Sequence, residues 1–358
     1  MHYYIFIIAV FMMLIPQEQA VAQRMIPSAT DLVPAIPDAK GFAGMYAGFV
    51  GDELVAAGGA NFPDKMPWEG GKKIWHDVIF VYSKQAGSWS QLPLKLPKKL
   101  AYGITVSYKN GLLLFGGSEQ DNVPSAAVYY LKKEGQSWQI EQLSQSPEAL
   151  VNMCGSRVGD HVILATGSSD LAGTPASKVF CYDLKKNSWH QLPDLPGQAR
   201  INAVSATSKD SFYVFSGIAL HNDAQGKTIR TMLTDAYQLD FGEKPYSWKK
   251  LQDLPVALAA GPLQAANLND QQFIFFGGLD QQTAQYADPA THPGFKPEVW
   301  AYSIAKNQWR EVGVLPKKEM RLTLPSVQHK NMYYLINGEV GPGVRSNSIL
   351  SIDLNNLK

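Results

Sequence analysis

The chain has 358 residues, with 32 Lys and Arg against 31 Asp and Glu, so its formal net charge is +1. This balance leaves no electrostatic footprint for a nucleic-acid partner. No charge run or basic amphipathic stretch predicts binding to a membrane surface.

The N-terminus has the pattern of a secretory signal. Residues 3–15 form an apolar run without charge, and Ala20-Val21-Ala22 provides a small-x-small cleavage site before Gln23. The alternative is an uncleaved membrane anchor, but the run is short for a span. We therefore predict a signal peptide over 1–22, a periplasmic or secreted mature protein, and no membrane association after cleavage.

A glycine signature then recurs along the chain, at a spacing of roughly 55 residues, which is near that of a kelch repeat. Its six copies are Ala57-Gly58-Gly59, Phe115-Gly116-Gly117, Ala165-Thr166-Gly167, Phe215-Ser216-Gly217, Phe276-Gly277-Gly278 and Ile336-Asn337-Gly338. A tyrosine and then a tryptophan follow each of the first five. The repeat predicts an all-β fold, a six-bladed kelch-type β-propeller, as one domain over 23–358.

The third repeat illustrates one blade. Short runs over 152–158, 161–166, 178–184 and 188–192 are separated by turn residues, which is typical of a four-stranded meander. Glycine at the end of the second strand allows neighbouring backbones to approach closely. Tyrosine and tryptophan are expected to fill the space between adjacent blades.

The sixth repeat ends at Asp353 without a fourth strand. The segment 31–37 resembles the fourth-strand end at 191–196. We expect this N-terminal segment to complete the last blade, which would join the two ends of the chain and remove exposed sheet edges.

The two cysteines are predicted to remain unpaired. Cys154 falls on the first strand of the third repeat and Cys181 on its third strand. Two strand spacings are roughly 9 to 10 Å, which exceeds the reach of a disulfide of about 7 Å.

Strand alternation places two kinds of loop at one mouth of the channel: the loops between strands two and three, and the connections between blades. Three of the loops between strands two and three are long, at 60–73, 218–230 and 279–297, so function is expected on this face. Its polar residues are Asn61, Glu69, Lys72, Lys73, Tyr102, Arg200, His221, Arg230, His292, Glu339 and Arg345. Glu339 and Arg345 are the strongest candidates, because a carboxylate and a guanidinium on one short loop suit proton transfer and anion binding. A surface salt bridge is the alternative.

These residues also carry a family resemblance. The segment 337–345, Asn-Gly-Glu-Val-Gly-Pro-Gly-Val-Arg, resembles an Asn-Gly-Glu-x-x-Pro-Gly-x-Arg segment of the sialic acid (N-acetylneuraminate) mutarotases, also called epimerases. The segments 68–73 and 101–103 resemble two others. The glutamate blade lies at the C-terminus here and in mid-chain in better-known members, which is typical of a cyclically permuted branch. A closed ring of blades tolerates such permutation.

The resemblance implies an isomerase that interconverts the α and β anomers of a small sugar acid by ring opening. It assigns Glu339 as general acid or base, and Arg345 as the group that clamps the carboxylate and stabilises developing charge. Weaker candidates for substrate contacts are Asn61, Lys72, Tyr102 and Arg200. No metal or organic cofactor is expected, and the oligomeric state stays open.

Three other functions were compared with this one. A non-catalytic propeller that binds carbohydrate or protein is the main alternative. A copper oxidase of the galactose-oxidase type would need a cysteine joined to tyrosine, but both cysteines fall on blade strands. A sialidase would show Ser-x-Asp-x-Gly-x-x-Trp boxes, which the sequence lacks.

Overall fold

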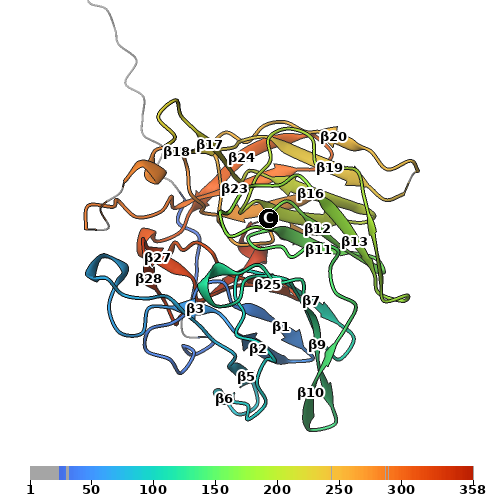
Figure 1. Ribbon diagram of the computed structural model, residues 1–358, viewed down its shortest axis with the longest axis vertical. Coiled ribbons are helices and arrows are strands. Elements are labelled where there is room, and N and C mark those ends of the chain that lie inside the picture. Colours follow the sequence, from blue (N-terminus) through green and yellow to red (C-terminus); the bar gives the residue numbers. More distant parts are fainter. Residues whose placement is uncertain (1–23, 30–31, 243, 287, 289, 358) are drawn as a thin grey trace, which may run out of the picture.

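The computed structural model describes residues 24–29, 32–242, 244–286, 288 and 290–357. Six antiparallel sheets surround a common centre, as Figure 1 shows. The first five sheets have four strands each, and the sixth has three named strands. The predicted all-β, six-bladed propeller is confirmed. The predicted signal peptide at 1–22 lies outside the described residues.

The blades follow chain order. Blades one and two comprise β1 (Tyr46–Val50), β2 (Glu53–Ala57), β5 (Ile79–Ser83), β6 (Ser88–Gln91), β7 (Ile104–Tyr108), β8 (Gly111–Phe115), β9 (Val128–Glu134) and β10 (Ser137–Gln142). Blades three and four comprise β11 (Cys154–Val158), β12 (His161–Ala165), β13 (Val179–Asp183), β14 (Ser188–Gln191), β15 (Val204–Ser208), β16 (Ser211–Phe215), β19 (Ala236–Asp240) and β20 (Trp248–Lys250). Blades five and six comprise β21 (Ala266–Leu268), β22 (Gln272–Phe276), β23 (Glu298–Ser303), β24 (Gln308–Val314), β25 (Ser326–His329), β26 (Met332–Ile336) and β29 (Ile349–Asp353).

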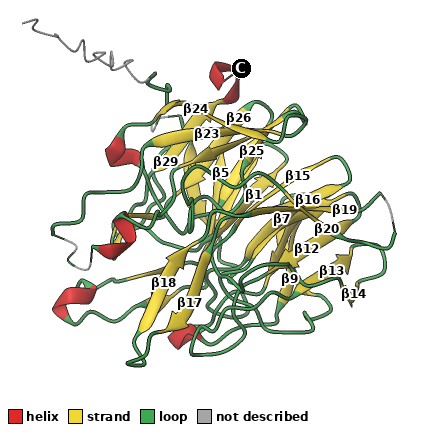
Figure 2. Cartoon of the chain, turned by 90° about the horizontal axis from the view of Figure 1, so that it is seen from above, coloured by secondary structure: helices red, strands yellow, loops and turns green. Residues whose placement is uncertain are grey.

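Three small hairpins lie in the loops between second and third strands. They are β3 (Ala60–Asn61) with β4 (Ile74–Trp75), β17 (Ile218–Asn222) with β18 (Thr228–Met232), and β27 (Glu339–Gly341) with β28 (Val344–Arg345). Short 3-10 helices are η1 (Pro67–Glu69), η2 (Gln120–Asn122), η3 (Thr283–Gln285), η4 (Lys317–Glu319) and η5 (Leu354–Leu357). Figure 2 shows β17 and β18 extending away from the body of the propeller.

Four of the five repeat tryptophans donate a hydrogen bond to a neighbouring blade. The indole N–H of Trp189, at the start of the fourth strand of blade three, donates to the carbonyl of Ser144 in the preceding blade at 3.0 Å. The same bond recurs from Trp248 to Pro193 at 2.9 Å and from Trp309 to Gln252 at 3.1 Å. In each case the acceptor is a carbonyl in the loop that follows the fourth strand of the preceding blade, so the bond joins neighbouring blades.

The N-terminal segment closes the ring in the same way. The indole of Trp89 donates to the carbonyl of Pro34 at 2.7 Å, so Pro34 takes the place that Pro193 has elsewhere. Ala29 forms an antiparallel bridge with Ser351 of β29, and the Ile36 N–H donates to the Asn347 carbonyl at 2.9 Å. The segment thus lies along the outer edge of blade six, paired through an isolated bridge and not through a full strand.

The glycine signature has a conformational cause. In all six copies both of the last two positions have positive φ, between 55° and 66° at the first and between 93° and 129° at the second. Glycine adopts these values without strain. A Cβ on Gly58 would lie 2.3 Å from the Leu100 carbonyl oxygen of the next blade, so close approach also requires glycine there.

A closed backbone ring surrounds the propeller axis at one mouth. One residue from each blade donates its N–H to the carbonyl of the corresponding residue of the preceding blade, at 2.8 to 3.2 Å. The members of this backbone ring are Gly44, Tyr102, Asn152, Asn202, Ala260 and Thr323. All six have φ between 50° and 63°.

The backbone ring also shows which loops share its mouth. In every blade the residue before the ring member forms an antiparallel bridge with the residue that follows the glycine signature, as Ala43 does with Ala60 and Leu322 with Glu339. The connections between blades and the loops after second strands therefore lie on one face, as predicted. The two cysteines are free and buried, on β11 and β13 with β12 between them, which confirms that they do not pair.

The closure of the last blade can be tested by substitution. Ile36 is 1% exposed, so Ile36→Ala should lower the free energy of unfolding by about 2–5 kcal/mol. Leu32 lies on the same segment but is 56% exposed, and Leu32→Ala should change it by less than about 0.5 kcal/mol. Thermal or denaturant unfolding measures both. Equal effects would show that the segment does not pack on blade six.

Candidate functional site

Glu339 and Arg345 face each other across the β27–β28 hairpin. The two residues are direct partners in the register, and directly opposed side chains in an antiparallel pair lie within contact. Nη1 of Arg345 donates to Oε1 of Glu339. The side chain of Arg345 is 6% exposed and that of Glu339 is 21% exposed. The pair is therefore a partly desolvated contact and not a loose surface salt bridge.

The hairpin is fixed to the mouth at both ends. The backbone of Glu339 exchanges two hydrogen bonds of 2.9 Å with Leu322, which precedes a member of the backbone ring. At the turn, Gly343 has φ of +75°, and a Cβ there would lie 2.8 Å from Cγ of Pro67 in η1. The loop of blade six therefore packs directly on the first long loop of blade one. Figure 1 shows β27 and β28 beside β3.

Blades one and two contribute three more side chains to the same place. The Arg345 guanidinium lies over the ring of Phe62, with its carbon 5.3 Å from the centroid. Nζ of Lys73 lies 5.0 Å from the ring centroid of Tyr102, a member of the backbone ring. We call Glu339, Arg345, Phe62, Lys73 and Tyr102 the mouth cluster.

Charge and burial in the mouth cluster shift two pKa values. Burial, and then the charge of Arg345, lower the pKa of Lys73 to about 8, while Glu339 opposes the shift. Burial raises the pKa of Tyr102 above its usual value, and Arg345 acts in the opposite direction. Tyr102 therefore keeps its phenolic proton at neutral pH and can donate a hydrogen bond. Two cations against one carboxylate leave the cluster suited to an anion.

The structure separates Lys73 from its neighbour Lys72. The side chain of Lys72 is exposed, whereas that of Lys73 is half-buried against aromatic rings. The sequence carried a signal for this difference. Side chains two residues apart in extended chain share a face, and Lys73 is two residues before Trp75, which is 2% exposed. We expected Lys72 to contact the substrate, whereas the structure brings Lys73 to the mouth cluster.

Asn61 does not present its amide to the mouth cluster. It is 1% exposed, its Nδ2 donates to the Gly41 carbonyl at 2.9 Å, and its Oδ1 lies 2.9 Å from Nε2 of His76. Both ends of the amide are used inside the protein. The structure thus gives Asn61 a structural role at the start of the first long loop and does not bring its amide to the mouth cluster.

Arg200 is also a structural residue. Its side chain is 0% exposed and forms a two-pronged ion pair with Asp235, at 2.6 and 2.8 Å. Its Nη1 donates to the Ser216 carbonyl at 3.0 Å, and its Nε to that of Gln198 at 3.1 Å. Four of its five N–H donors are thus used inside the protein, which gives Arg200 a structural role in blade four. The pairing could not be anticipated because Asp235 lies 35 residues away.

Glu69 belongs to the architecture of the same loop. Its carboxylate accepts the Met66 N–H at 3.0 Å and so closes η1. Gly70 follows in the left-handed region, with φ of +80°, and a Cβ on Gly71 would lie 1.8 Å from the Lys65 carbonyl oxygen. These residues shape the turn that delivers Lys73 to the mouth cluster.

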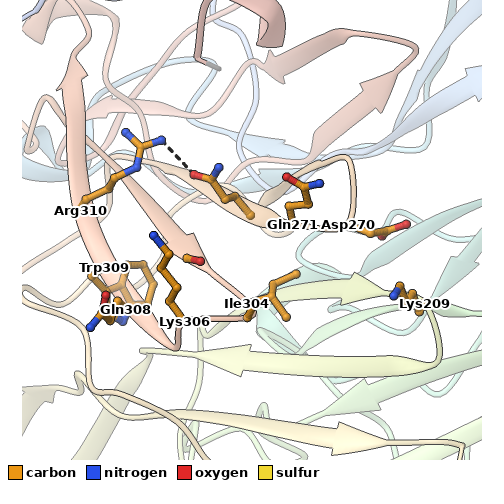
Figure 3. Close-up of a pocket in the computed structure, with 11 residues that line it drawn as sticks. Lys209, Asp270, Gln271, Ile304, Lys306, Gln308, Trp309 and Arg310 are labelled. Carbon is orange, nitrogen blue, oxygen red and sulfur yellow. Dashed lines mark hydrogen bonds between the residues drawn. The ribbon is translucent and has the colours of Figure 1, made fainter.

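A separate surface hollow lies away from the mouth cluster. It has a volume of about 680 Å³ and is formed by turns of blades four and five, as Figure 3 shows. Its side chains include Lys209, Lys306 and Arg310, and Arg310 donates to Gln272 at 2.9 Å. These are mostly exposed turn residues, so the partly desolvated ion pair at the mouth, beside Lys73 with its lowered pKa, is the stronger candidate for chemistry. Among the described residues, no group of three or more His, Cys, Asp or Glu side chains is placed to hold a metal ion.

The fold and the mouth cluster define a kelch-type β-propeller with a glutamate–arginine ion pair at one mouth. The family model of the Attractin/LZTR1 β-propeller matches residues 54–343, and the chain belongs to this family. No helix of the described residues is long and apolar enough to cross a membrane.

Curated relatives confirm the resemblance found in the sequence. An N-acetylneuraminate epimerase of Vibrio vulnificus is 40% identical over 108 residues, covering 26% of this chain and 28% of the relative. One of Salmonella paratyphi B is 27% identical over 233 residues, covering 58% and 57%. The chain thus spans less than two thirds of the length of these relatives. A solved chain titled "Structure of YjhT" matches with a TM-score of 0.64 and 16% identity, covering 89% of this chain and 96% of that one, and it shares the fold.

The structural role of Arg200 leads to a test by unfolding. Arg200→Met leaves the Asp235 carboxylate half-buried without its cation, which should lower the free energy of unfolding by roughly 3 kcal/mol or more. The double variant Arg200→Met/Asp235→Leu should recover much of this loss, because no unpaired charge remains. Lys72→Met serves as a surface control. Full stability of Arg200→Met alone would contradict the assignment.

Proposed function

We propose that this protein is an N-acetylneuraminate epimerase, or mutarotase, which interconverts the α and β anomers of the free sugar acid. The Glu339–Arg345 pair carries the proposal, because it places a desolvated proton-transfer group at the mouth where the loops meet. The names of the curated relatives support the substrate. The permuted position of the glutamate blade supports a distinct branch of the same activity.

The chemistry requires proton transfer on both sides of one bond. A base removes the proton of the anomeric hydroxyl, and the bond between the anomeric carbon and the ring oxygen breaks as that oxygen gains a proton. The open-chain ketone then rotates and closes on its other face. Proton transfer by a positioned side chain typically gives 10²–10⁴-fold acceleration.

Three residues of the mouth cluster have separate roles in this reaction. Glu339 takes the anomeric proton and returns one. Arg345 holds the Glu339 carboxylate in one orientation and stabilises charge that develops beside it. The Tyr102 phenol donates a hydrogen bond to a sugar hydroxyl. These steps need no metal or organic cofactor.

The location is part of the proposal. The segment 1–22 would act as a cleaved signal, and the mature protein would meet the free sugar acid in the periplasm or outside the cell. N-terminal sequencing of the protein recovered from a periplasmic fraction should begin at Gln23. A mature chain that retains Met1 would contradict the cleavage.

The role of Glu339 is tested with one pure anomer. Glu339→Gln removes the proton-transfer group but keeps its shape, so the rate of equilibration, followed by proton NMR, should fall about 10²–10⁴-fold. Glu134→Gln, on the β9–β10 hairpin, is the matched control and should retain the wild-type rate. Tight sugar binding without acceleration in the wild type would instead favour a carbohydrate-binding propeller.

A further inference from the structure

Lys73 is held in the mouth cluster without a carboxylate of its own. Its Nζ lies 4.5 Å from the ring centroid of Trp75 and 5.0 Å from that of Tyr102. Its hydrogen bond goes to a neutral amide oxygen, Oδ1 of Asn122, at 3.0 Å. Within the part of the chain that the structure describes, Lys73 takes part in none of the ion pairs.

Arg345 is less available for an incoming anion. Its Nη1 is committed to Glu339, its guanidinium is covered by Phe62, and its side chain is only 6% exposed. Its Nε is buried and has no hydrogen-bond partner among the described residues. A substrate could reach this donor only after a neighbouring side chain moved.

The position of Lys73 is fixed largely by residues of blade two. The side chain of Gln120 in η2 donates to the Lys73 carbonyl at 3.3 Å, and the Trp75 indole donates to Ser118 Oγ at 2.9 Å. The Tyr102 ring occupies space that only Gly44 leaves free, since a Cβ there would lie 2.4 Å from Cδ1 of Tyr102. The ammonium is therefore preorganised by aromatic faces, which attract cations.

We propose that Lys73, and not Arg345, is the cation that receives the carboxylate of the sugar acid, with Glu339 left free to act at the anomeric carbon. This inference rests on the proposed function for the identity of the substrate. It assigns Lys73 as a substrate-binding residue and Arg345 as the positioning partner of Glu339.

Electrostatics supports the assignment. Burial, and then the charge of Arg345, lower the pKa of Lys73, and the charge of Glu339 offsets only part of this shift. An arriving carboxylate would add negative charge beside Lys73 and favour the protonated amine. The charged and titratable groups that face Lys73 are Glu339 on β27, Arg345 on β28 and Tyr102 in the backbone ring, while Asp121 of η2 is engaged by Gln120 at 3.2 Å.

The test compares N-acetylneuraminate with its methyl ester, which lacks the negative charge. Lys73→Met should raise KM for the acid about 10- to 100-fold, as expected for loss of a charge-assisted hydrogen bond, with a smaller change in kcat. It should change KM for the ester little, so the variant no longer distinguishes acid from ester. Lys72→Met, on the exposed neighbour, should behave as the wild type, and Lys73→Arg should retain most of the preference for the acid.

The pH dependence gives a second readout. The wild-type kcat/KM for the acid should fall as pH rises through about 8, where free Lys73 loses its proton. In Lys73→Arg this fall should move to higher pH, because the guanidinium stays protonated. With the methyl ester as substrate, kcat/KM should show no fall caused by deprotonation of Lys73, either in the wild type or in the variants.

The outcomes separate this inference from the proposed function. Wild-type acceleration together with an unchanged KM for the acid in Lys73→Met would overturn the role of Lys73 and leave the epimerase standing. Equal losses for acid and ester would overturn it as well, because a structural role would not distinguish them. Binding of the acid that depends on Lys73, measured by calorimetry in a wild type that accelerates nothing, would support Lys73 and overturn the epimerase.

Discussion

Six peptide groups, one from each blade, join N–H to C=O in a closed cycle at the mouth of the propeller. Five of the six residues are not glycine and still adopt left-handed φ. Such a conformation costs roughly 1–2 kcal/mol for an L-residue, and less for asparagine, while a hydrogen bond contributes about 1 kcal/mol net. The two contributions nearly cancel, so the ring adds little net stability. Its consequence is geometric, because it fixes the height and direction of every loop that leaves the mouth.

This constraint explains why residues from opposite ends of the sequence form one site. Glu339 follows the last glycine signature and Lys73 lies in the first long loop, but blades six and one are neighbours once the ring closes. Two contacts hold blades six and one together: the Gly338 N–H donates to the Phe42 carbonyl at 2.8 Å, and Gly343 packs on Pro67. A permuted chain can therefore present the same cluster, since the contacts depend on the order of blades around the ring and not on where the chain begins.

The blades could be predicted from sequence because each marker residue meets a requirement that every repeat shares. Glycine provides positive φ and close approach, and tryptophan provides a donor to the neighbouring sheet. The Glu339–Arg345 contact was also within reach, because a short hairpin makes its two residues direct partners. The structural partners of Arg200 and Asn61, Asp235 and the Gly41 carbonyl, could not be anticipated, because only the folded loops bring them together. The preference for Lys73 over Lys72 was also within reach, because Lys73 lies two residues before the buried Trp75 and so shares its face in extended chain.

The site arises where the repeat departs from its own pattern. The residue after the glycine signature makes the same backbone bridge in all six blades. In blade six this residue is Glu339, and in blades one to five it is Ala60, Ser118, Ser168, Ile218 and Leu279. Only blade six places an ionisable side chain there. Blade six departs from blade four at a second position. Arg321 of blade six corresponds to Arg200 of blade four and makes matching bonds to the backbone. Where blade four has Asp235, however, blade six has Ser348. Burial lowers the pKa of Arg321 to about 10. Among the described residues, blade six thus keeps an arginine beneath its loop without the ion pair that neutralises the equivalent arginine of blade four, and Glu319 offsets only part of the effect of burial on its pKa.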